Sequence, residues 1–286
     1  MTEGSKSKDQ QILFDSRPIG VFDSGIGGIT VLRELLKKFP EEQFIYLGDT
    51  ARLPYGSKSS DTVRKYSEQN MNFLKHRDVK AIVVACNTAS TQIFETEYCG
   101  LPVYNVIDPG SKLAAMTTEN KKVAVIATRA TVKSESYTKK IHSHDSSIEV
   151  LSTACPLFVP LAEEGWHDDP ITNLIAFRYL QELKSKDVDT VVMACTHYPL
   201  LKSAIQKVFG LHVKLIDSGE AIAQEIQNDF TSQRLLCTEK IEPSLNKKQL
   251  LTICLTDSGT QFENLAINLI AGYTESQVVF ETVSVI

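Results

Sequence analysis

The chain alternates short apolar runs with longer amphipathic segments, and this alternation predicts the order of its secondary-structure elements. Between many of the runs, apolar residues recur every three or four positions, as at 29–39 and 169–186, which is typical of helices. Strands that alternate with helices in this way indicate an α/β fold with mainly parallel sheets, covered by helices on both faces. The runs typical of strands buried on both sides occupy 18–22, 43–47, 81–85, 102–107, 122–127, 148–152, 190–194, 212–216 and 250–255.

Two stretches of the chain are repeated further along it. Residues 77–87 match residues 186–196, and residues 105–110 match residues 214–219, both with an offset of 109 positions and no gaps. Two separate matches with one offset predict two halves built on the same plan. The pattern alone leaves open which half the C-terminal segment 217–286 joins.

Length and composition narrow the class of protein. A chain of 286 residues, 42% of them apolar, is long enough for one large domain or two of ordinary size. The net charge of −5, without long runs of like charge, argues against nucleic acid or an anionic membrane as the main partner. No apolar run reaches the roughly 18 residues of a membrane span, and polar residues 1–17 predict a disordered leader instead of a secretory signal. Six scattered cysteines without a C-x-x-C pair then predict free thiols in the cytoplasm.

Cys86 and Cys195 each follow a predicted strand and precede a predicted helix, at 87–98 and 196–209. In a parallel sheet, ligands bind beyond the carboxyl ends of the strands, so both thiols fall where a ligand site is expected. A helix N-terminus lowers the pKa of a thiol, and His197 is near enough to Cys195 to exchange a proton with it. The alternative for each cysteine is an inert packing role, since free cysteines are often buried.

Two thiols that face each other across one cleft suit several chemistries. One is a disulfide switch, and another is a zinc site formed by Cys86, Cys195 and His197, although zinc sites usually contain closely spaced pairs of ligands. A third is proton transfer on both faces of one carbon atom, in which one thiolate removes a proton and the opposite thiol supplies one. Near-symmetric halves favour this third use, because its substrate and product are mirror images.

The glycine-rich segment 21–32 connects the first predicted strand to the first predicted helix. A dinucleotide-binding loop would have glycine at three positions, but here Gly25 and Gly27 are followed by Thr30. Asp23 would also place a negative charge close to a pyrophosphate. The segment therefore favours a small zwitterionic ligand over a nucleotide.

Seven motifs occur in order along residues 18–270: FDSGIGG, YLGDTARLPYG, ACNTAS, VIDPG, ACPLFVPLAEEG, ACTHYP and IDSG. In this set the sequence resembles the cofactor-independent glutamate racemases of the aspartate/glutamate racemase superfamily. The resemblance implies that Cys86 and Cys195 transfer the proton, and that Asp23 and His197 support them as acid, base or orienting groups. The substrate contacts that it implies come from Asp23, Ser24, Tyr55, Gly56, Asn87, Thr88, Thr196 and His197.

The resemblance also implies the architecture. It predicts a first α/β domain of residues 18–110 plus 217–286 and a second of residues 111–216, with the active site in the cleft between them. Glu163 is a further candidate near the site. The sequence departs from the family at Ala194, where many members have glycine.

The activity implied is the interconversion of L- and D-glutamate, which supplies D-glutamate for peptidoglycan, with no pyridoxal cofactor and no metal. The polar leader resembles those of members regulated by a cell-wall precursor, and a homodimer is one option for the assembly. The alternatives are a racemase for aspartate or another small acid, a non-catalytic two-domain ligand-binding protein, and a redox switch.

Overall fold

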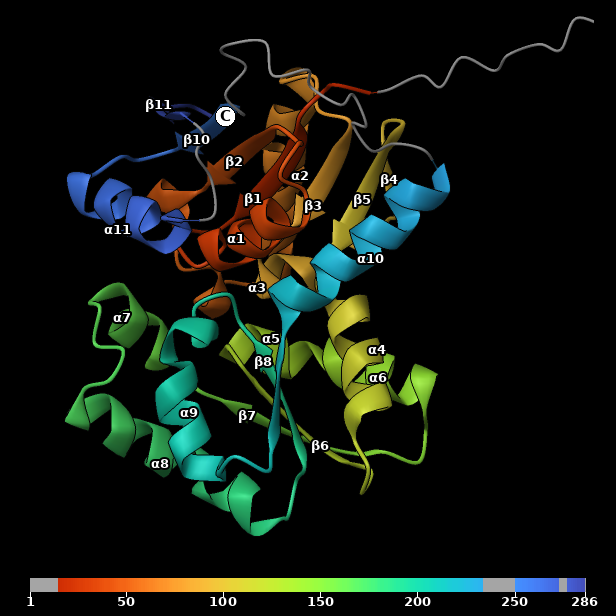
Figure 1. Cartoon of the computed structure of the whole chain (residues 1–286), viewed down its shortest axis with the longest axis vertical. Coiled ribbons are helices and arrows are strands. Elements are labelled where there is room, and N and C mark those ends of the chain that lie inside the picture. The colour runs from red at the N-terminus through yellow and green to blue at the C-terminus, as the bar shows by residue number, and fades with distance from the viewer. Residues whose placement is uncertain (1–14, 234–249, 273–276, 286) are drawn as a thin grey trace, which may run out of the picture.

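The structure of the chain, a computed structural model, describes residues 15–233, 250–272 and 277–285. Its strands form two separate sheets, one in the upper and one in the lower half of Figure 1. Most of the predicted leader, residues 1–14, lies outside the described residues, as does Cys237. Within the described ranges, no helix is both long and apolar enough to cross a lipid bilayer.

The large sheet has seven strands in the order β11-β10-β2-β1-β3-β5-β4, and every neighbouring pair is parallel except β4 with β5. Its strands are β1 (Ile19–Asp23), β2 (Phe44–Gly48), β3 (Ala81–Val84), β4 (Glu97–Tyr98), β5 (Leu101–Asn105), β10 (Leu250–Leu255) and β11 (Gln277–Thr282). The small sheet has four parallel strands in the order β7-β6-β8-β9. Its strands are β6 (Lys122–Ala127), β7 (Glu149–Ala154), β8 (Thr190–Ala194) and β9 (Lys214–Asp217).

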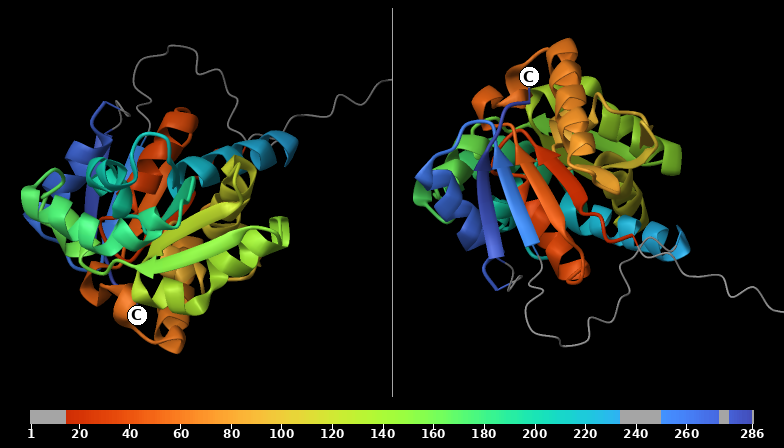
Figure 2. Two further views of the ribbon diagram at one scale, coloured as in Figure 1. Left: turned by 90° about the horizontal axis from the view of Figure 1, so that it is seen from below. Right: turned by 90° about the horizontal axis from the view of Figure 1, so that it is seen from above.

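Helices cover both faces of each sheet, as the views in Figure 2 show. The α-helices are α1 (Ile29–Lys38), α2 (Ser60–His76), α3 (Asn87–Ser90), α4 (Ile107–Thr117), α5 (Arg129–Ser134), α6 (Ser136–His144), α7 (Phe158–Glu163), α8 (Pro170–Ser185), α9 (Lys202–Phe209), α10 (Ser218–Gln233) and α11 (Thr260–Ile270). Three short 3₁₀ helices are η1 (Thr50–Arg52), η2 (Tyr55–Ser57) and η3 (Tyr198–Leu201).

The first strand, β1, shows why the predicted architecture forms. All of its residues are buried: Ile19 and Val21 pack with α1 and α10 on one face, while Phe22 packs with α2 on the other. Successive side chains of a strand point to opposite faces, so an unbroken apolar run is buried only where helices cover both faces. The predicted α/β fold with mainly parallel sheets is therefore confirmed.

The chain passes between the two sheets twice. Helix α4 follows β5 of the large sheet and leads to β6 of the small sheet, and α10 follows β9 and leads back toward β10. These crossover helices contact each other (Figure 1). The second repeated motif falls at both crossings, because Asp108 lies in the first turn of α4 and Asp217 ends β9 directly before α10. The domain division at 110/111 and 216/217 stays a prediction.

The predicted strands all occur, within two residues of their expected bounds. The short strand β4 and the partly exposed edge strand β11 were not predicted. The helix predicted at 87–98 is wrong. Helix α3 ends at Ser90, and Ile93 is buried in the core beside α2 while the chain turns into antiparallel β4.

Two glycines allow loops of the large sheet to touch loops of the small sheet. A Cβ added at Gly27, after β1, would lie 2.3 Å from Thr196 Oγ1 and 2.4 Å from His197 Nδ1. A Cβ added at Gly56, in η2, would lie 2.8 Å from the Cβ of Thr128, which follows β6. At both positions the backbone approaches its neighbours too closely for a side chain, so the contact between the two sheets depends on glycine.

We expect Gly27→Ala to lower the free energy of unfolding by about 1–3 kcal/mol, because the added methyl group must displace Thr196 and His197. Urea denaturation followed by circular dichroism measures this change. Gly259→Ala is the control, since a Cβ there meets nothing within 4 Å and should cost less than about 1 kcal/mol. Equal effects of the two substitutions would contradict the close contact at Gly27.

Candidate active site

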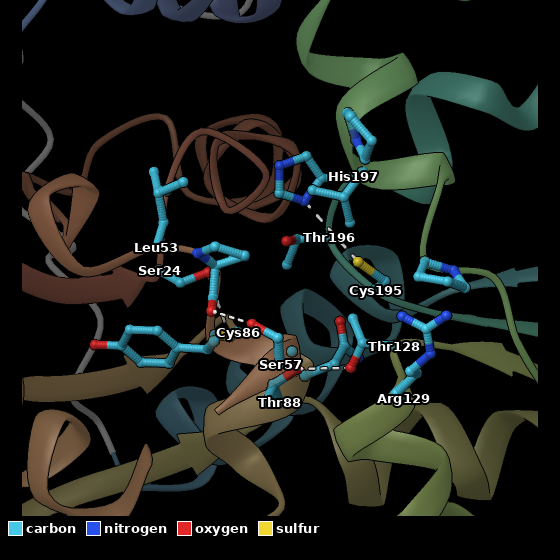
Figure 3. Close-up of a pocket in the computed structure, with 18 of the residues that line it drawn as sticks. Ser24, Leu53, Ser57, Cys86, Thr88, Thr128, Arg129, Cys195, Thr196 and His197 are labelled. Carbon is cyan, nitrogen blue, oxygen red and sulfur yellow. Dashed lines mark hydrogen bonds between the residues drawn. The ribbon is translucent and has the colours of Figure 1, made fainter. Parts of the chain in front are cut away.

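A cavity of about 140 Å³ lies between the carboxyl ends of strands from both sheets. In Figure 3, Ser24 and Cys86 lie on one side of it, and Cys195 and His197 lie on the other. The residues that line the cavity are Ser24, Gly25, Leu53, Pro54, Tyr55, Gly56, Ser57, Cys86, Asn87, Thr88, Thr128, Arg129, Pro156, Val159, Pro160, Glu163, Cys195, Thr196 and His197. Except for Asp23, the structure brings all the predicted site residues to this one cavity.

Cys86 directly precedes α3 and is 5% exposed. Its Sγ accepts a hydrogen bond from the backbone N–H of Ala89 at 3.4 Å and donates to Ser24 Oγ at 3.8 Å. Burial, and then the negative charge of Asp23, raise the pKa of this thiol well above its usual value, and the Ala89 N–H offsets only part of that rise. The expectation of a lowered pKa is therefore wrong for Cys86, because α3 is a single short turn and the sulfur is out of water.

Cys195 directly follows β8 on the opposite side of the cavity and is 6% exposed. Its Sγ lies 3.9 Å from His197 Nδ1, and His197 Nε2 lies 3.1 Å from Glu163 Oε1. Burial lowers the pKa of His197, but its hydrogen bonds with Cys195 and Glu163 and the charge of Asp23 outweigh burial and raise it to about 10. His197 is therefore protonated at neutral pH and can donate to both partners.

Asp23 is fully buried behind the cavity wall and is not among the lining residues. Its Oδ2 accepts from the Gly25 N–H at 3.0 Å, and its Oδ1 accepts from Thr196 Oγ1 at 3.4 Å, so it joins the loops of the two sheets. Burial raises the pKa of this carboxyl, and the positive charge of His197 opposes the rise. Asp23 therefore acts on the cavity through Cys86, Thr196 and His197.

Asn87 and Thr88 begin α3 and are buried at the cavity wall. Asn87 Nδ2 donates to Tyr137 Oη at 2.7 Å, whereas Asn87 Oδ1 has no hydrogen-bond partner among the described residues. Thr88 Oγ1 lies 3.0 Å from Thr128 Oγ1 and 3.2 Å from Thr131 Oγ1. The hydroxyls of Thr88, Thr128 and Thr131 thus connect the two halves, and the oxygen of Asn87 is a buried acceptor that is not paired within the described residues.

Tyr55 and Gly56 reach the cavity from η2. The hydroxyl of Tyr55 donates to Asp49 and accepts from Asn70 Nδ2, and both partners are buried in the large-sheet half. Tyr55 therefore presents no hydroxyl to the cavity, while Gly56 brings its backbone close to Thr128.

Sequence reasoning missed several lining residues, among them Thr128 and Arg129. Both directly follow β6, whose strand was predicted at 122–127, so the rule that placed Cys86 and Cys195 at strand ends would also have found them. Arg129 is exposed at the cavity and has no ion-pair partner in the described part of the chain. The segment after β7, with Pro156, Val159 and Pro160, also follows a predicted strand and belongs to one of the seven motifs, so the same rule covers it.

The geometry also bears on the zinc alternative. In the part of the chain that the structure describes, no group of three or more His, Cys, Asp or Glu side chains is placed to hold a metal ion. The cysteines described there, including Cys86 and Cys195, are free thiols.

Comparison with known proteins places the chain in a family. The sequence profile of Asp/Glu/Hydantoin racemase matches residues 19–226. A glutamate racemase from Geobacter metallireducens is 49% identical over 222 residues, which span 77% of this chain and 82% of that protein. The crystal structure of Francisella tularensis glutamate racemase with D-glutamate matches with a TM-score of 0.84 at 37% identity, covering 94% of this chain and 98% of that one. Escherichia coli glutamate racemase with L-glutamate and the activator UDP-MurNAc-ala matches at 0.75 and 29% identity, covering 94% and 99%. The chain therefore belongs to the glutamate racemases of the Asp/Glu/hydantoin racemase family.

Proposed function

We propose that the cavity binds glutamate and interconverts its enantiomers by proton transfer through Cys86 and Cys195. The observation that carries the proposal is the pair of buried thiols, which line one cavity from two different sheets. Racemisation must remove a proton from one face of the α-carbon and return one to the other face, so it needs two such groups. Family membership supports glutamate as the substrate.

The protonation states of the two thiols suit the conversion of L-glutamate to D-glutamate. In the step from L- to D-glutamate, Cys195 as a thiolate takes the α-proton, and Cys86 as a thiol gives its own proton to the opposite face. The raised pKa of Cys86 supports this, since it keeps a proton on that sulfur. Protonated His197 can donate a hydrogen bond to Cys195 Sγ. The reverse reaction exchanges the two roles.

Two carboxyl groups support these thiols in the proposed mechanism. The negative charge of Asp23 opposes ionisation of Cys86 and so favours its proton-donating form. Glu163 holds the far nitrogen of His197, which fixes the ring with Nδ1 toward Cys195. Both residues thus orient and charge the groups that touch the substrate, and a closed cavity strengthens these electrostatic interactions.

Substrate binding is proposed for Ser24, Gly56, Asn87, Thr88, Thr196 and His197 and for the ring of Tyr55, which all line the cavity. Hydroxyl and N–H groups suit a carboxylate, and the free oxygen of Asn87 suits an ammonium group. Arg129 adds a permanent positive charge for an acidic substrate.

We propose that the product, D-glutamate, is used for peptidoglycan synthesis and that the protein acts in the cytoplasm. The activator in the Escherichia coli structure supports a cell-wall precursor as a regulator here too, and adding UDP-MurNAc-ala to the racemisation assay tests this. A homodimer is proposed as the assembly, with sedimentation as its test.

The central test removes one thiol at a time and follows the α-hydrogen of each enantiomer by proton NMR in heavy water. Cys86→Ala should exchange the α-hydrogen of L-glutamate slowly without forming D-glutamate, because Cys195 can still remove a proton and return one on the same face. Cys195→Ala should do the converse with D-glutamate. Cys99→Ala, at an exposed cysteine, is the control and should keep wild-type racemisation.

Near wild-type racemisation by either variant would refute the two-thiol mechanism. Wild-type protein that binds glutamate without exchange or racemisation would instead support the non-catalytic binding protein. If aspartate were racemised as fast as glutamate, the protein would instead be assigned as a racemase for aspartate or another small acid.

Glu163→Gln should lower the pKa of His197 from about 10, because the amide accepts a hydrogen bond without contributing negative charge. The imidazole then loses its proton at lower pH, and the fall in racemisation on the alkaline side should begin at correspondingly lower pH. The imidazole NMR shift as a function of pH measures the change. Glu164→Gln, at the exposed neighbouring residue, is the control, and an identical titration in both variants would contradict the role of Glu163.

Arg129→Gln should raise KM for glutamate about tenfold, which corresponds to about 1.4 kcal/mol. The variant lacks the positive charge that attracts the acidic substrate into the cavity, so kcat should change little. The difference between wild type and variant should shrink at high salt, which screens an exposed charge. Lys133→Gln, on the same helix but outside the cavity lining, is the matched control. An unchanged KM in Arg129→Gln would exclude this residue from substrate capture.

A further inference from the structure

The amide of Asn87 is held by two hydroxyl groups from outside its own helix. Asn87 Nδ2 donates to Tyr137 Oη of α6 at 2.7 Å and to Ser218 Oγ, the first residue of α10, at 3.3 Å. Both hydrogens of the amide nitrogen are therefore used. All three side chains are buried.

The surroundings of the two hydroxyls favour the amide as the donor to both, because each hydroxyl has another acceptor for its own hydrogen. Tyr137 Oη can donate to the carbonyl of Val106 at 3.5 Å, and Ser218 Oγ can donate to the carbonyl of Met193 at 3.4 Å. The two hydroxyls also lie 3.3 Å apart, where either one can donate to the other. A hydroxyl has one hydrogen, so a hydroxyl that donates to a carbonyl offers only lone pairs to other neighbours. The Asn87 amide therefore turns its nitrogen, which is a donor, toward the lone pairs of the two hydroxyls.

The other end of the Asn87 amide, its oxygen Oδ1, is then a hydrogen-bond acceptor. With Nδ2 directed at the two hydroxyls, Asn87 Oδ1 is buried without a partner among the described residues, on a side chain that belongs to the cavity lining. A buried acceptor without a donor is unfavourable, so the site gains when a ligand supplies a hydrogen there. A flipped amide would present a donor to the ligand, and its oxygen lone pairs would face the lone pairs of the two hydroxyl oxygens.

We propose that Tyr137 and Ser218 are positioning residues that fix the polarity of the Asn87 amide, so that its oxygen accepts a hydrogen bond from the ammonium group of the amino-acid ligand. This inference rests on the proposed function for the identity of the ligand. It assigns a role to two residues outside the cavity lining, one from a helix packed on the small sheet and one from a crossover helix.

The test compares two ligands that differ in the ammonium group alone. Binding of D-glutamate and of glutarate, which has both carboxylates and no amine, is measured by calorimetry on wild type and Tyr137→Phe. Phenylalanine keeps the buried ring and removes the hydroxyl. We expect the Kd for D-glutamate to rise about tenfold, or about 1.4 kcal/mol, and the Kd for glutarate to change less than twofold. Tyr104→Phe is the matched control, because Tyr104 is also buried and its hydroxyl pairs with Asp229 of α10 away from the cavity; both Kd values should stay at wild-type levels.

A double-mutant cycle separates positioning from a general structural effect. If Tyr137 acts through Asn87, adding Tyr137→Phe to Asn87→Ala should cause no further loss of D-glutamate binding. Ser218→Ala should show the same selective loss as Tyr137→Phe, which keeps the test decisive if one variant folds poorly.

Equal weakening of D-glutamate and glutarate, or a full additional loss in the Asn87→Ala background, would overturn the proposal. The two hypotheses fail separately. If the wild-type protein binds D-glutamate more tightly than glutarate but does not racemise it, the catalytic proposal is refuted. The binding data for Tyr137→Phe and Ser218→Ala then still decide the positioning role. Wild-type protein without any preference for the amine would refute the role of Asn87 directly.

Discussion

The site depends on the contact between the carboxyl ends of two parallel sheets, which is made at Gly27 and Gly56 by backbone without side chains. In a parallel sheet all strands end at one edge, so each sheet brings its own loops and its own cysteine to that edge. Because the loops touch, groups from both sheets share hydrogen bonds, such as Thr196 with Asp23 and Thr30 Oγ1 with the Thr196 carbonyl. The cavity therefore has two chemically distinct walls a short distance apart.

The surroundings of the two thiols give the two walls different proton affinities. On one side, burial and Asp23 hold a proton on Cys86. On the other, the hydrogen bonds with Cys195 and Glu163 and the charge of Asp23 hold a proton on His197. The sequence repeat relates the two cysteines, but the charged side chains that surround each of them in space differ. A pseudo-symmetric fold thus provides an asymmetric pair of acid and base, which a single turnover in one direction requires.

The strands and the paired cysteines could be predicted from the sequence because both are local: apolar runs show the strands, and one offset relates the motifs. The contacts between Glu163 and His197 and between Tyr137 and Asn87 could not, since each joins segments that only the tertiary fold brings together. The raised pKa of Cys86 was missed for the same reason. The position of a thiol before a helix is visible in the sequence, whereas the length of that helix and the depth of burial are not.

The two crossings of the chain have a consequence for the order in which the protein is assembled. All four strands of the small sheet lie in one continuous stretch, from β6 to β9, whereas the large sheet is completed by β10, which pairs with β2. During synthesis from the N-terminus, the strands of the small sheet are all available before β10 is made. Until then β2 is an open edge of the large sheet, with unpaired backbone groups and an apolar neighbourhood. The early half of the large sheet must therefore wait for the last part of the chain, and that interval is when the protein is most open to wrong pairing.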